Sequence, residues 1–366
     1  MNLAHPGVSL AVAVACLSGV LAYAYIERTM RGNEGADFNQ FRAAATLAGT
    51  GRLYDYDSIR AAERPFHERL IPFGRLPFYA VVFKPIALLP YGWGRVAWWI
   101  ITVLAMAGFA WLWPLKPRFF VVALFWSCPL WMLLNYGQDT ALFMFMALAG
   151  LQLLVMKRDF AAGLVLSLCA SKFHLALAIP VFLAANRRWR ALAGGAIGGA
   201  VILGVSFLAE GPDWVAHLIE LSRRPEFDPA PWRMPNLAGL VSGLPSPLPL
   251  ELMLGSAAML AVWRICRRAP LEIGMMAALT GGLAVSHHSQ AYDCVLLLPA
   301  LFSVLMLPSP EALRLWALAL LTPVPYLFLL EERLSLLGRL LVVGFIVAWL
   351  TTLAITRATV EWKHKS

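Results

Sequence analysis

Charged side chains are scarce in this 366-residue chain. Only 14% of its residues are Asp, Glu, Lys or Arg, whereas soluble domains carry about a quarter. Apolar residues make up 60% of the chain, and the mean hydropathy is +0.68. A water-soluble fold of this length could not bury so much apolar surface. The composition therefore argues against a soluble protein and predicts an all-α integral membrane protein.

Cysteine is also scarce, with five residues in the chain. Four of them lie inside apolar runs, at Cys16, Cys128, Cys169 and Cys294, and Cys266 is expected in a basic loop. This distribution does not suggest a disulfide framework. We interpret the cysteines as small core residues without redox chemistry.

Motifs of soluble catalysis are missing as well, since the chain has no phosphate loop, dinucleotide fingerprint, zinc-protease motif or nucleophile elbow. His287 and His288 are adjacent, but a full set of zinc ligands at accepted spacing is missing, so neither a metal nor another cofactor is expected. The net charge is +9, yet the basic residues are scattered through loops. Anionic membrane lipid, and not nucleic acid, is therefore the expected partner.

Apolar stretches near the length that crosses about 30 Å of hydrocarbon recur along the chain. They predict one domain over residues 1–366, a polytopic bundle of about twelve helices. The first stretch could be a signal peptide, because Ala22-Tyr23-Ala24 imitates a cleavage site, but no Lys or Arg precedes it and we favour an uncleaved helix. The predicted stretches are 6–26, 95–113, 119–134, 140–156, 160–171, 175–186, 191–209, 251–265, 271–286, 291–307, 312–330 and 336–356.

Lys and Arg gather in alternate short loops, as at Lys157-Arg158 and Arg187-Arg188, whereas the loops at 136–139 and 286–293 contain none. Positive loops stay in the cytoplasm, so both termini are predicted to be cytoplasmic, in a membrane expected to be the bacterial inner membrane. Between the two basic pairs the chain must cross out and back in legs too short for full spans. We expect a short hairpin that turns near residues 171–174 and lines a cavity.

Two long loops are expected on the extracytoplasmic side, at 27–94 and 210–250. In the first, the pattern predicts a helix over 37–47, and the proline-broken apolar run at 76–89 predicts a helix lying in the interface. The second loop contains an aromatic and proline-rich section at 225–235 that suits a lid or docking surface.

Ionisable groups at membrane depth are costly and are therefore candidates for function. Asp37 precedes the first loop helix, where capping of that helix is the simpler alternative. Lys172 and His174 at the hairpin turn could hold a phosphate or carboxylate, or Lys172 could snorkel or pair with an acid. The segments 136–139 and 286–293 could line a sugar or phosphate site, or be ordinary turns.

Several short sequence strings, taken in their order along the chain, resemble those of glycosyltransferase family 87, the membrane mannosyltransferases that use polyprenyl-phosphate-mannose. The resemblance covers most of the chain and implies a type C glycosyltransferase fold. The family often has Tyr-Pro-Pro where this chain has Leu76-Pro77-Phe78-Tyr79, and often proline where it has Phe173. The matching strings are Ala36-Asp37-Phe38, Gly51-Arg52-Leu53-Tyr54-Asp55-Tyr56, Phe83-Lys84-Pro85-Ile86-Ala87-Leu88-Leu89-Pro90, Gly137-Gln138-Asp139, Ser171-Lys172 with Asn186-Arg187-Arg188-Trp189, and Ser286-His287-His288 with Tyr292-Asp293.

The resemblance implies transfer of a hexose, mannose in the family, from a polyprenyl-phosphate-sugar donor to a hydroxyl of a lipid or glycan acceptor. The donor would enter sideways and react at the outer face with inversion. Asp37 would be the general base, with Glu34 as the rival carboxylate. The donor phosphate would be bound by Lys172, with His174, Arg42 and Arg75 helping. The sugar or acceptor pocket would be lined by Gln138, Asp139, His287, His288 and Tyr292.

Two other classes of function would also explain many helices. A transporter or flippase of lipids or lipid-linked sugars is the main alternative, but such proteins often contain internal repeats, and we find none with a fixed period. A structural subunit would leave the lysine at membrane depth and the clustered histidines without a role. The donor sugar and the acceptor stay open, because arabinose or another hexose would suit the same residues.

Overall fold

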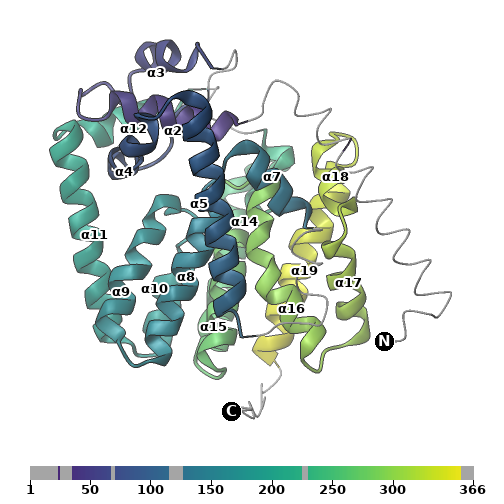
Figure 1. The fold of residues 1–366 in the computed structure, drawn as a ribbon. Helices are drawn as coiled ribbons and strands as arrows, with labels where there is room; N and C mark the ends of the chain where they lie inside the picture. The colour runs from purple at the N-terminus through teal and green to yellow at the C-terminus, as the bar shows by residue number, and fades with distance from the viewer. Residues whose placement is uncertain (1–23, 25–34, 67–70, 115–126, 225–229, 356–366) are drawn as a thin grey trace, which may run out of the picture.

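The computed structural model describes residues 24, 35–66, 71–114, 127–224 and 230–355. Over these ranges the chain forms helices joined by turns, without a β-strand. The bundle stands below a layer of short helices (Figure 1). Two expected elements lie wholly or partly outside these ranges: the stretch 6–26, apart from residue 24, and the first half of the stretch 119–134, residues 119–126.

Four described helices are long and apolar enough to cross a membrane, or up to six if each of two bent helix pairs counts as one span. They confirm an all-helical membrane protein, whereas the full set of about twelve crossings stays a prediction. The four are α5 (Tyr91–Leu112), α11 (Trp189–Glu210), α14 (Pro247–Cys266) and α19 (Ser335–Ile355). Cys266 is the last residue of α14 and is buried, so its expected place in a loop was wrong.

The two bent pairs are interrupted at residues that stop a helix. α17 (Glu311–Leu321) and α18 (Val324–Leu330) meet at 60°, because Pro323 cannot donate a backbone hydrogen bond, so the stretch 312–330 is not one continuous helix. α7 (Cys128–Tyr136) and α8 (Thr140–Val155) meet at 115°. Gly137 sits in that turn with φ of 73°, a conformation that suits glycine.

The expected short hairpin is confirmed. Its first leg is α9 (Asp159–Ser167) followed by the 3₁₀ helix η1 (Leu168–Lys172), and its second leg is α10 (Ala178–Ala185). Figure 1 shows both legs ending below the upper layer, short of the top of α11. A Cβ at Gly163 or Gly194 would collide with the backbone of the facing helix, so glycine lets α9 and α11 pack closely and fixes the depth of the hairpin.

The layer above the bundle, here called the cap layer, consists of the four helices α2, α3, α4 and α12 (Figure 1). α2 confirms the helix predicted over 37–47, and α4 confirms a helix within 76–89. Glu210 at the end of α11 fastens this layer, because its carboxylate accepts hydrogen bonds from Gly49 N at 2.7 Å and Leu53 N at 3.4 Å. The bounds are α2 Ala36–Leu47, α3 Tyr56–Glu63, α4 Pro77–Ala87 and α12 Trp214–Ser222.

The second long loop is tied to the bundle at two points. Asn236 is fully buried, and its side-chain amide donates to Ser286 O at 2.6 Å. Arg339 on α19 donates to Gly239 O in the short helix α13. The remaining elements are η3 (Pro231–Arg233), α13 (Leu237–Val241), α15 (Leu271–Val285), η4 (Ala291–Leu297) and α16 (Leu298–Met306).

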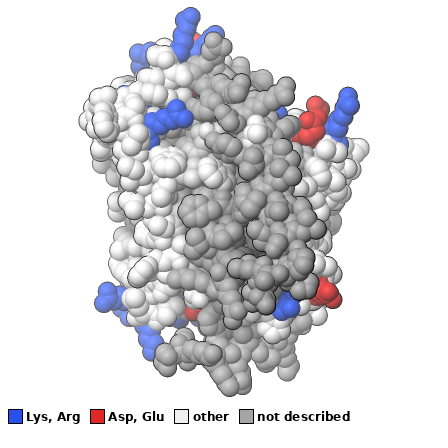
Figure 2. All heavy atoms as spheres, turned by 45° about the vertical axis from the view of Figure 1, so that its right-hand side comes forward, with Lys and Arg blue, Asp and Glu red and all other residues white. Residues whose placement is uncertain are grey.

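Charge on the surface follows the ends of the bundle. On the face shown in Figure 2, the described Lys, Arg, Asp and Glu gather at the two ends and the described band between them is uncharged, as expected of a surface that faces lipid. The basic turns between α8 and α9 and between α10 and α11 lie together at the end opposite the cap layer (Figure 1). Which side of the membrane that end faces stays a prediction, as does the placement of both termini.

Candidate active site

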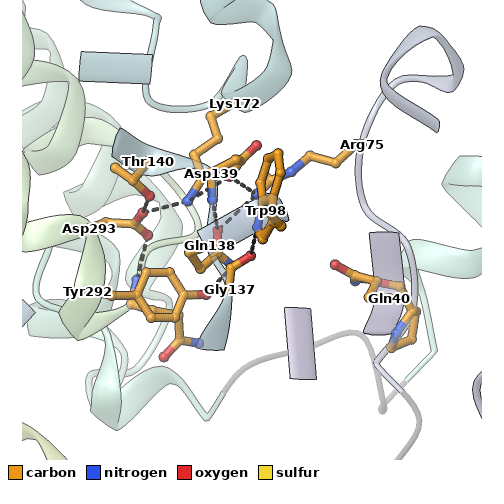
Figure 3. Close-up of polar contacts among 12 residues, drawn as sticks. Gln40, Arg75, Trp98, Gly137, Gln138, Asp139, Thr140, Lys172, Tyr292 and Asp293 are labelled. Atoms are coloured by element: carbon orange, nitrogen blue, oxygen red, sulfur yellow. Dashed lines mark hydrogen bonds and ion pairs between the residues drawn. The ribbon is translucent and has the colours of Figure 1, made fainter. Parts of the chain in front are cut away.

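Four charged side chains form one buried ion-pair cluster (Figure 3). Lys172 Nζ lies 2.7 Å from Asp293 Oδ1 and 3.6 Å from Asp139 Oδ1. Arg75 Nη2 lies 2.9 Å from the same Asp139 oxygen. Two positive and two negative charges cancel, and at this burial charged groups need such partners. We call these four residues the ion-pair cluster.

Four separate segments supply the cluster. Asp139 follows the turn at Gly137, Lys172 ends η1, Asp293 lies in the first turn of η4, and Arg75 comes from the segment before α4. The tight approach of Gly137 to Phe38 helps to place Asp139, since a Cβ at Gly137 would lie 2.8 Å from Phe38 Cβ. Asp139 does not cap α8 with its side chain, and Lys172 pairs with acids and does not snorkel.

Neutral groups complete the cluster. Thr140 Oγ1 donates to Asp293 Oδ1 at 2.9 Å, and the backbone N–H of Gln290 donates to Asp293 Oδ2 at 3.0 Å. Gln138 Nε2 donates to the Tyr292 hydroxyl at 3.0 Å, while its Oε1 lies 3.3 Å from Arg75 Nη2. The structure thus brings the predicted residues Gln138, Asp139 and Tyr292 together. Figure 3 shows Gln40 well apart from them.

Asp37 lies in the first turn of α2 and is only 8% exposed. Burial raises the pKa of its carboxyl to about 6, against a hydrogen bond from Gln138 and the positive charges of Lys172 and Arg75. Among the described residues no ion pair joins Asp37 to a cation. The side chain is therefore a buried carboxyl with a pKa near neutrality, beside the cluster but not neutralised by it.

A second buried carboxyl lies nearby, on α3, and sequence reasoning missed it. Glu63 is 2% exposed, and its Oε2 accepts a hydrogen bond from Ile71 N at 2.9 Å. Burial, together with the charge of Asp37, raises its pKa to about 8, although the bond from Ile71 opposes this. Asp37 ionises first, so Glu63 must ionise beside a charge of the same sign. The rival base Glu34 lies outside the described residues.

The three histidines of the prediction are divided. His174 and His288 face one another at the edge of the cluster, with ring centroids 5.7 Å apart. Burial lowers the pKa of His288 to about 4, so its ring is neutral at pH 7. His287 points elsewhere: its side chain is 81% exposed and Nδ1 lies 3.0 Å from Glu251 Oε1. Within the described ranges, no three His, Cys, Asp or Glu side chains are grouped to hold a metal.

Arg42 is not part of the cluster, because it donates to Leu89 O at 2.9 Å and stacks against the Phe66 and Tyr91 rings. A groove of about 350 Å³ opens between α5 and α7. Its walls are mostly apolar, with the exposed guanidinium of Arg95 at one side. Residues lining it include Gly35, Phe38, Arg95, Trp99, Leu134 and Gly137. The lining therefore includes the chain neighbours of Asp37 and Gln138, namely Phe38 and Gly137.

The fold and this site define a polytopic helical membrane protein in which a buried carboxyl, without an ion-pair partner among the described residues, lies beside a charge-neutral cluster. The chain belongs to glycosyltransferase family 87, whose model matches residues 77–286, so the expected family is confirmed. The match includes Gln138, Asp139, Lys172 and His174, and it begins after Asp37.

Two curated relatives are named polyprenol-phosphate-mannose-dependent alpha-(1-2)-phosphatidylinositol pentamannoside mannosyltransferase. The protein of Mycolicibacterium smegmatis is 34% identical over 188 residues, which cover 49% of this chain and 44% of the relative. The protein of Mycobacterium tuberculosis is 31% identical over 182 residues, covering 46% and 40%. The chain thus spans less than half the length of either relative. No solved structure matches it.

Proposed function

We propose that the protein transfers a hexose, most simply mannose, from a polyprenyl-phosphate-sugar to a hydroxyl of a lipid or glycan acceptor. The buried carboxyl of Asp37 carries this proposal, because a general base works best with a pKa near the working pH. Family membership and the donor named for both relatives support it. The groove between α5 and α7 offers a lipid chain a lateral path, and its lining includes Phe38 and Gly137, the chain neighbours of Asp37 and Gln138.

In the proposed reaction Asp37 accepts the proton of the acceptor hydroxyl as that oxygen attacks the anomeric carbon. The attack comes from the face opposite the phosphate, so the new C–O bond forms as the bond between carbon and phosphate oxygen breaks, and the configuration inverts. The polyprenyl phosphate leaves with the bonding electrons. Asp37 needs only to reach the hydroxyl, and cations need only to offset the charge of the leaving phosphate.

The sequence assigns that phosphate to Lys172, His174, Arg42 and Arg75, and these stay proposed contacts. They are not equivalent in the structure. Lys172 and Arg75 are already paired with carboxylates, so their attraction for a phosphate is largely cancelled. Arg95 lines the groove, and Arg42 Nη1 lies against Gly94 next to it in the chain, 3.3 Å from where a Cβ of residue 94 would be. Neither arginine forms an ion pair with a described acidic residue. We therefore expect the phosphate nearer to these two arginines, with the sugar toward the cluster.

A flippase is the second candidate from the sequence, and membership of a transferase family disfavours it. One experiment separates the two. Membrane vesicles holding the wild type, Asp37→Asn or Asp159→Asn receive a panel of radiolabelled polyprenyl-phosphate-sugars together with membrane lipid and glycan acceptors. Asp159 is the matched control, because it pairs with Arg188 at the far end of the hairpin.

We expect Asp37→Asn to lower transfer by roughly 10²- to 10⁴-fold, with Asp159→Asn close to the wild type. Full transfer activity of Asp37→Asn would show that Asp37 is not the general base. If the wild type transfers no sugar from any donor but moves a lipid-linked sugar between leaflets, the transferase proposal is wrong and the flippase replaces it.

A further inference from the structure

Three buried polar atoms at the edge of the ion-pair cluster have no hydrogen-bond partner among the described residues. They are Tyr79 Oη, Arg75 Nε and Asp139 Oδ2. Their residues are only 7%, 8% and 1% exposed. Native structures rarely leave such atoms unpaired, and each case calls for an explanation. Three of them in one place indicate a site for a polar ligand.

Independent contacts place the three atoms in one neighbourhood. Arg75 and Asp139 are joined through their other atoms, Nη2 and Oδ1, at 2.9 Å. The ring of Tyr79 packs on Phe41 with centroids 5.1 Å apart, and the Arg75 guanidinium lies 5.8 Å from the same ring. Burial first, and then the Asp139 charge, raise the pKa of the Tyr79 phenol, while Arg75 opposes them. The phenol is thus close to the carboxylate and interacts with it as a hydrogen-bond donor, although this contact does not reach the geometry of a full hydrogen bond.

The chemistry of the three atoms selects a class of ligand. An ionised carboxylate oxygen only accepts hydrogen bonds, a guanidinium Nε–H only donates, and a phenol does both. Neighbouring hydroxyls of a sugar ring match this set, because each hydroxyl also donates and accepts. A phosphate does not match it, since it would meet the negative Asp139 oxygen in a cluster whose charges already cancel.

We infer that Tyr79, Arg75 and Asp139 form a subsite for two neighbouring hydroxyls of the transferred sugar. The inference rests on the proposed function and deepens it. It assigns Tyr79, which lies in an apolar run and has no role in the proposed reaction, as a specificity-determining residue. It also moves Arg75 from the donor phosphate to the sugar ring.

The test compares a full donor with four donors that each lack one sugar hydroxyl. The kcat/KM of each donor is measured for the wild type, Tyr79→Phe and Tyr326→Phe. Tyr326 is the matched control: it is 1% exposed, and its hydroxyl donates to Leu320 O at 2.8 Å, between α17 and α18. Thermal unfolding in detergent shows that each variant is folded.

We expect the wild type to lose roughly tenfold on one of the deoxy donors, which is the effect of about one hydrogen bond. Tyr79→Phe should lose a similar factor on the full donor but nothing further on that same deoxy donor, because the bond is already gone. Tyr326→Phe should follow the wild type on every donor.

Three results would overturn the inference. One is a Tyr79→Phe variant whose kcat/KM on the full donor equals that of the wild type. Another is that, for every deoxy donor, the loss caused by Tyr79→Phe and the loss caused by the missing hydroxyl multiply, as independent effects do. The third applies even if Tyr79→Phe does not fold: a wild type that uses all four deoxy donors within twofold of the full donor has no such subsite. If the wild type transfers no sugar from the full donor, the proposed function itself fails, which is a separate result.

Discussion

The buried carboxyls of the cap layer differ from those of the bundle in one respect, their partners. In the bundle, Asp139 and Asp293 share Arg75 and Lys172 in ion pairs of 2.7–3.6 Å. In the cap layer, Asp37 and Glu63 are just as buried but have no paired cation among the described residues, and burial raises their pKa values to about 6 and about 8. Pairing with Lys172 holds the pKa of the Asp293 carboxyl below its usual value despite burial, whereas a buried carboxyl without such a partner can exchange protons near neutral pH.

Removing a cation from the ion-pair cluster of the bundle should have the largest effect on stability. Lys172→Met leaves Asp293 and Asp139 with only one cation, and removal of one partner from a buried pair costs about 3–5 kcal/mol. We expect a loss of that size in the free energy of unfolding, measured in detergent, together with loss of sugar transfer. Lys172→Met combined with Asp293→Asn should regain part of the stability, because no acid is then stranded.

The control for that variant is Arg188→Met. Arg188 pairs with Asp159 where the two side chains are 28% and 19% exposed, so the loss should stay below about 1 kcal/mol. Equal losses in the free energy of unfolding for Lys172→Met and Arg188→Met would show that burial of the ion-pair cluster adds nothing to stability. The contrast between the carboxyls of the bundle and those of the cap layer would then fail.

The pH dependence of sugar transfer tests whether the buried carboxyl of Asp37 in the cap layer is the base. Asp37 must be ionised to accept a proton, and its pKa is raised to about 6. We expect kcat/KM to be level above that pH and to fall about tenfold for each pH unit below it. The measurement is a pH profile in vesicles equilibrated on both sides. An acid limb centred near pH 4 would mean that the base is a solvated carboxyl and not Asp37.

Glu63→Gln tests whether the second unpaired carboxyl is kept neutral by its surroundings. Its pKa in the folded protein is raised from 4.5 to about 8, so the folded state holds the proton more tightly than the unfolded state does. Stability is then full below about pH 4.5 and declines as pH rises toward 8. Glu63→Gln should remove this decline, leaving the variant up to about 3–5 kcal/mol more stable than the wild type at pH 9 relative to pH 5.

That comparison is read from unfolding midpoints of both proteins across the pH range. Parallel curves would show that Glu63 stays in contact with solvent. In the Asp37→Asn background the gain should be smaller, because one reason for the raised pKa of Glu63 is the charge of Asp37.

The sequence predicted features that depend on depth in the membrane. The basic pairs at 157–158 and 187–188 and the short apolar legs between them indicated the hairpin, and with it a lysine that the structure buries. The helix after Asp37 and the helix within 76–89 followed from apolar pattern and proline position. These features are set by charge and length along the chain, which a single sequence records directly.

Features that depend on the rotation of a helix about its axis could not be predicted. Lys172 and Asp293 are 121 positions apart, and nothing in either segment states that they meet. His287 and His288 are adjacent, yet only the second faces the cluster. Tyr79 and Glu63 lie in segments whose pattern gives no sign of a site. A buried lysine does require an acid, and the matching strings contained both acids that pair with Lys172, Asp139 and Asp293.

The carboxylate of Glu210 has a consequence for how substrates arrive. Because it accepts backbone N–H groups of Gly49 and Leu53, the α2–α3 turn is anchored to a long helix of the bundle and is not free to swing upward. We therefore expect this part of the cap layer to keep its position over the bundle. We expect substrates to approach Asp37 from the side, in the plane of the bilayer, so that a substrate's anchorage in that leaflet matters before any contact with its sugar does.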